Sequence, residues 1–69
     1  MLAELEELLS RLTAAQRRLI LASAKARTFP TNSTLNKIAT LALNISAVES
    51  MIAEAQDRAH RAKLIKAND

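Results

Sequence analysis

The feature that most constrains this chain is the distribution of residues that interrupt helices. Its 69 residues include no glycine and a single proline, Pro30, near the middle. Because glycine and proline are the strongest helix breakers, their absence elsewhere permits one long helix on each side of Pro30. Proline disfavours helix in the preceding residue, and Thr31, Asn32 or Ser33 can cap the helix that follows. We predict one helix over about 2–27, a turn over about 28–33 and a second helix over about 34–65.

Apolar residues on both sides of the turn recur at steps of three and four, the spacing of a packed helix face. Folding one predicted helix back on the other places Leu5 opposite Ala55 and Leu12 opposite Val48. The pattern predicts an all-α fold, an antiparallel two-helix hairpin that resembles a coiled coil and forms one domain over 1–69. Residues after Ala59 lack a partner and overhang. The predicted seam consists of Leu5, Leu8, Leu12, Leu19, Ile38, Leu41, Ile45, Val48 and Ile52.

The predicted seam leaves other large apolar side chains without a place in the core. Small domains usually need a disulfide, a metal or a partner, and this chain has no cysteine. Burying each leftover side chain is worth on the order of 1.5–3 kcal/mol. We therefore predict an oligomer, in which a second protein or another copy of the chain completes a larger bundle; the sequence does not decide between them. The predicted partner-binding residues are Leu2, Leu9, Ile20, Leu35, Leu43 and Met51.

Chemistry-bearing motifs are scarce, and we expect neither an enzyme nor a cofactor. No glycine loop is available for phosphate, and no serine or threonine stands beside a plausible base. Glu54, Asp57 and His60 have the spacing of metal ligands on a helix, but the first helix supplies no inward carboxylate to complete a site. We expect no metal. No apolar run approaches the roughly 20 residues of a membrane span, so we expect a cytoplasmic protein without a membrane partner.

Two segments resemble a known family. The opening Leu2-Ala3-Glu4-Leu5-Glu6-Glu7-Leu8-Leu9 and the run Ala47-Val48-Glu49-Ser50-Met51-Ile52 are similar to those of small co-chaperones of type III secretion needle subunits. The resemblance implies an antiparallel helical hairpin that binds and stabilises a helical-repeat chaperone. It further implies that this complex keeps the needle subunit unpolymerised in the cytoplasm before export.

Two other interpretations fit the same pattern. Arg11, Arg18 and Lys25 recur every seven residues and draw one basic line along the first helix. Such a line suits a homodimeric four-helix-bundle regulator that contacts RNA, although a solvated helix edge has the same pattern. A phage or plasmid protein that inhibits a host factor by laying a hairpin in its groove has the same physical signature.

Overall fold

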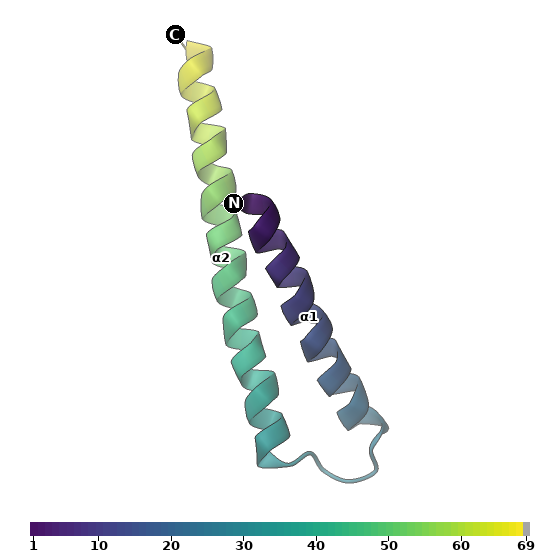
Figure 1. Cartoon of the computed structure of the whole chain (residues 1–69). Coiled ribbons are helices and arrows are strands. Elements are labelled where there is room, and N and C mark those ends of the chain that lie inside the picture. Colours follow the sequence, from purple (N-terminus) through teal and green to yellow (C-terminus); the bar gives the residue numbers. More distant parts are fainter. Residues whose placement is uncertain (69) are drawn as a thin grey trace.

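A computed structural model describes residues 1–68, with side-chain exposure for residues 1–63. It consists of two helices, α1 (Leu2–Lys25) and α2 (Asn32–Asn68), which run antiparallel and are joined by one turn (Figure 1). Over residues 1–68 the chain contains no strand. The predicted all-α hairpin is confirmed.

The helix ends follow the local chemistry around Pro30. Helix α1 ends at Lys25, because Ala26 adopts an extended conformation (φ −70°, ψ 141°) while its N–H still donates to the Ala22 carbonyl. Thr31 caps α2: the Thr34 N–H donates to Thr31 Oγ1 at 3.2 Å, which satisfies a backbone donor of the first helical turn. The residue that caps α2 is therefore Thr31.

Side chains of the two helices meet along a single seam, in which Val48 is the one buried apolar residue among residues 1–63, at 8% exposure. The other seam positions are half-buried. All five seam residues predicted on the second helix lie there. On α2 the series is Thr34, Ile38, Leu41, Ile45, Val48, Ile52 and Ala55; on α1 it is Leu2, Leu5, Leu9, Leu12, Ala15, Gln16, Leu19 and Ser23.

The first helix presents a different face from the one predicted. Leu8 is 43% exposed, whereas Leu2 and Leu9, predicted to bind a partner, are half-buried in the seam. Both faces of α1 share Leu5, Leu12 and Leu19. The observed face adds two leucines, along with polar side chains nearer the turn, where the predicted seam adds only Leu8. Because burial energy scales with apolar area, the face with more leucines is favoured.

This rotation of α1 also changes the register of the hairpin. When the two half-buried series are matched end to end, Leu5 is level with Ile52 instead of Ala55, a shift of about one helical turn. One hydrogen bond crosses the seam here, from Gln16 Nε2 to the Ile38 carbonyl at 3.5 Å. Among the α2 residues up to Lys63, half-burial ends at Ala55, and the last part of the helix projects beyond α1 (Figure 1).

The molecule is a thin rod, with extents of 62 × 15 × 15 Å. Its radius of gyration is 17.4 Å, against about 11 Å for a compact domain of this length. Its accessible surface is 5743 Å², against about 4,200 Å² for a compact monomer of its mass. The isolated hairpin thus keeps a large surface in water.

Candidate interaction surface

Large apolar side chains are exposed on every side of the hairpin. Of the six predicted partner-binding residues, Ile20, Leu35, Leu43 and Met51 are exposed, and Leu43 reaches 74%. Four further exposed side chains were not predicted to bind a partner. Two of them carry a signal in the sequence: Leu21 lies outside the predicted and the observed seam, and Phe29 is the one aromatic residue. The exposed set comprises Met1, Leu8, Ile20, Leu21, Phe29, Leu35, Leu43 and Met51.

The positions of these residues follow from the helical period. Ile20 of α1 and Leu35 of α2 flank one side of the seam, and Leu8 and Met51 flank the other. Leu43 lies on the outer face of α2, farthest from α1, which explains its high exposure. The exposed apolar side chains therefore lie around the hairpin and not on one face of it.

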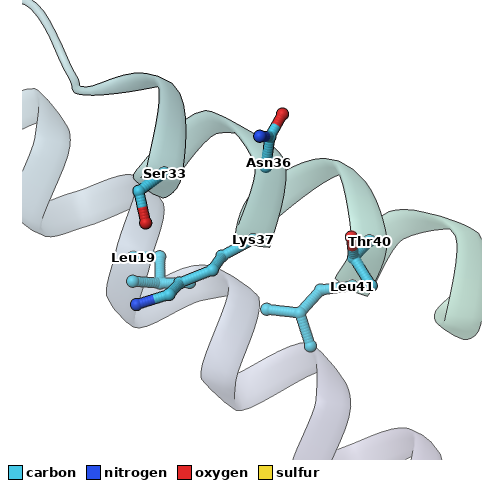
Figure 2. A pocket seen from close by; sticks show the side chains of 6 residues that line it. All are labelled: Leu19, Ser33, Asn36, Lys37, Thr40 and Leu41. Carbon is cyan, nitrogen blue, oxygen red and sulfur yellow. The ribbon is translucent and has the colours of Figure 1, made fainter.

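An open groove of about 700 Å³ lies between the helices near the turn (Figure 2). Leu19 of α1 and Leu41 of α2 supply its apolar part, and Lys37 extends across it toward Leu19 (Figure 2). Ser33, Asn36 and Thr40 add polar groups on the α2 side. Two leucines beside hydroxyl and amide groups suit an apolar side chain of a partner, with hydrogen bonds at the rim.

The predicted basic line is solvent-exposed along its whole length. Arg11 Nη2 donates to Glu7 Oε1 at 2.7 Å, an exposed pair one turn apart. Arg18 and Lys25 are exposed and form no ion pair with any carboxylate of the part that the structure describes. These two cations are therefore available to an external anion.

The carboxylates of the candidate metal group are engaged with arginines. Glu54 lies 3.9 Å from Arg58, and Asp57 lies 3.2 Å from Arg61, each pair one turn apart on α2. His60 is exposed. Within the described residues, no group of three or more His, Cys, Asp or Glu side chains has the arrangement of a metal site.

One segment of α2, Asn32–Lys63, is long and apolar enough to cross a membrane by length and composition alone. The prediction that no such run exists does not hold on these two criteria, because Glu49 is the only charged residue between Lys37 and Glu54. Only 6% of the most apolar window is buried in the hairpin. The core helix of a soluble protein can have the same length and composition.

Comparison of the chain with protein-family models, curated proteins and solved structures finds no match. The description of this surface therefore rests on the hairpin's own residues: a half-buried seam surrounded by exposed leucine, isoleucine and methionine side chains.

Proposed function

We propose that this chain is a non-enzymatic protein-interaction module, a small cytoplasmic co-chaperone that binds and stabilises the helical-repeat chaperone of a type III secretion needle subunit. The observation that carries the proposal is the exposed surface. It exceeds that of a compact monomer by about 1,500 Å², more than the roughly 800 Å² that one partner contributes to a standard interface.

The chemistry of that surface supports a helical partner. Leucine, isoleucine and methionine side chains at helical spacing fit between the ridges of other helices, as they do in helix-in-groove complexes. Leu43 and Met51 project from α2 without taking part in the seam, so a partner can cover them while the hairpin stays closed. The specific choice of a needle-subunit chaperone comes from the resemblance of the Leu2–Leu9 and Ala47–Ile52 segments to that co-chaperone family.

Co-expression with a helical-repeat needle chaperone, followed by affinity purification, tests the proposal. We expect a stoichiometric complex that Leu43→Asp weakens at least tenfold, because a carboxylate replaces an apolar anchor at the interface. Ser50→Asp is the matched control, since it places the same charge on the same outer face of α2 without removing an apolar side chain. Failure of the wild-type chain to retain the chaperone would refute the choice of partner.

A further inference from the structure

Acidic and basic side chains are separated along the hairpin. Between Leu8 and Val48 the sequence contains no aspartate or glutamate, whereas it contains six cations. Because α1 and α2 are antiparallel, this acid-free stretch folds into the half of the hairpin that ends in the turn (Figure 1). The cations of this half are Arg11, Arg17, Arg18, Lys25, Arg27 and Lys37, all of them exposed.

Most of these cations have no neutralising partner. Arg11 pairs with Glu7. The other ion pairs of the described residues involve Glu4, Glu54 and Asp57, which lie toward the end of the hairpin away from the turn. The five cations beyond Arg11 are thus free of ion pairs with the carboxylates of the described residues. Exposed charges within a screening length of about 10 Å reinforce one another, so the turn half carries a positive potential that attracts anions.

An exposed aromatic side chain lies at the extremity of this cationic half. Phe29 is 84% exposed and stands in the turn, between Arg27 and Pro30. The turn forms the end of the rod opposite to the projecting part of α2 (Figure 1). Exposed phenylalanine side chains insert at the boundary between lipid headgroups and acyl chains, and lysine and arginine beside them favour anionic lipid phosphates.

We propose that the turn end of the hairpin docks on an anionic lipid surface, with Phe29 entering the headgroup region and Lys25, Arg27 and Lys37 contacting phosphates. These cations are exposed and held by no carboxylate, so they can adjust to laterally mobile headgroups. Single-stranded RNA is a poorer occupant, because proteins that bind it stack bases on several aromatic side chains and this turn has one. Leu43 and Met51 remain free for the protein partner, so this contact is independent of the proposed function.

Co-sedimentation of the full chain with lipid vesicles tests the proposal. We expect binding to vesicles of three parts phosphatidylcholine to one part phosphatidylglycerol, and far weaker binding to phosphatidylcholine alone. Each cation near such a surface is worth about fivefold in partitioning, so Lys25→Glu with Arg27→Glu should weaken binding by at least about 25-fold. Phe29→Ser should weaken it as well.

Matched variants separate the turn end from the rest of the molecule. Arg61→Glu with Lys63→Glu changes the net charge equally in the projecting part of α2, and Leu43→Ser removes an exposed apolar side chain elsewhere; both should leave vesicle binding unchanged. Circular dichroism checks that each variant stays helical. Equal binding to neutral vesicles, equal loss in the control variants, or binding that persists at molar salt would overturn the proposal. If the chain retains an RNA duplex through Lys25 and Arg27 and does not bind vesicles, the ligand of the turn end is RNA and the lipid proposal is wrong.

Discussion

Introducing a carboxylate at Val48 or at Leu43 separates the residues that close the hairpin from those that face outward. Both positions lie in the middle of α2, at 8% and 74% exposure respectively. Val48→Asp removes a burial worth about 1.5–2 kcal/mol and places an acid in the seam, where an unpaired charge costs several kcal/mol more. The sum exceeds about 3 kcal/mol, a large share of the 5–15 kcal/mol that stabilises an ordinary domain.

Leu43→Asp has a much smaller cost within the hairpin. Leucine and aspartate differ by about 0.5 kcal/mol in helix propensity, and the little burial lost at Leu43 adds a similar amount, giving about 1 kcal/mol. Urea unfolding followed by far-ultraviolet circular dichroism measures both variants. We expect Val48→Asp to lose most of its helical signal and Leu43→Asp to keep it. Equal losses in the two variants would show that α2 does not present the seam described here.

Three further predictions concern the turn, the seam and the projecting part of α2. Thr31→Ala should lower the free energy of unfolding by about 1 kcal/mol, because the Thr34 N–H loses its cap, while Thr31→Ser should restore most of it. Gln16→Leu should raise the melting temperature, since an apolar side chain then fills a half-buried seam position. A lower melting temperature would mean that the lost hydrogen bond to the Ile38 carbonyl outweighs the added apolar burial. Removing residues 61–69 should leave the melting temperature unchanged, because no α2 side chain from residue 56 to residue 63 is half-buried; a clear drop would show that the seam extends further.

The second helix was predictable because its apolar side chains admit one solution. Ile38, Leu41, Ile45, Val48 and Ile52 are large and β-branched or γ-branched, and no competing series of similar size occurs on that helix. The turn was predictable for a similar reason, since Pro30 and the hydroxyl side chains after it leave few alternatives. The choice of Thr31 as the cap needed the backbone geometry.

The first helix was less predictable because two faces share its central leucines. A single helix does not reveal which of Leu8 and Leu9 turns inward; only the match with α2 decides it. Gln16 and Ser23 in the seam also depart from the apolar pattern, and their sequence gives no signal for that placement. The same uncertainty about which face of α1 turns inward affects the predicted partner-binding residues of that helix. Those on α2 are exposed as predicted, whereas Leu2 and Leu9 move with the rotation of α1.

The most direct test of the central claim, that the hairpin presents apolar surface for another protein, is the solution mass of the purified chain by light scattering, with circular dichroism on the same samples across a concentration series. We predict a helical monomer at low concentration that associates without a fixed stoichiometry as concentration rises. A monodisperse and fully helical monomer at every concentration would contradict the claim. A stable, fully helical dimer would show instead that a second copy covers the surface, which favours the four-helix-bundle interpretation over the co-chaperone.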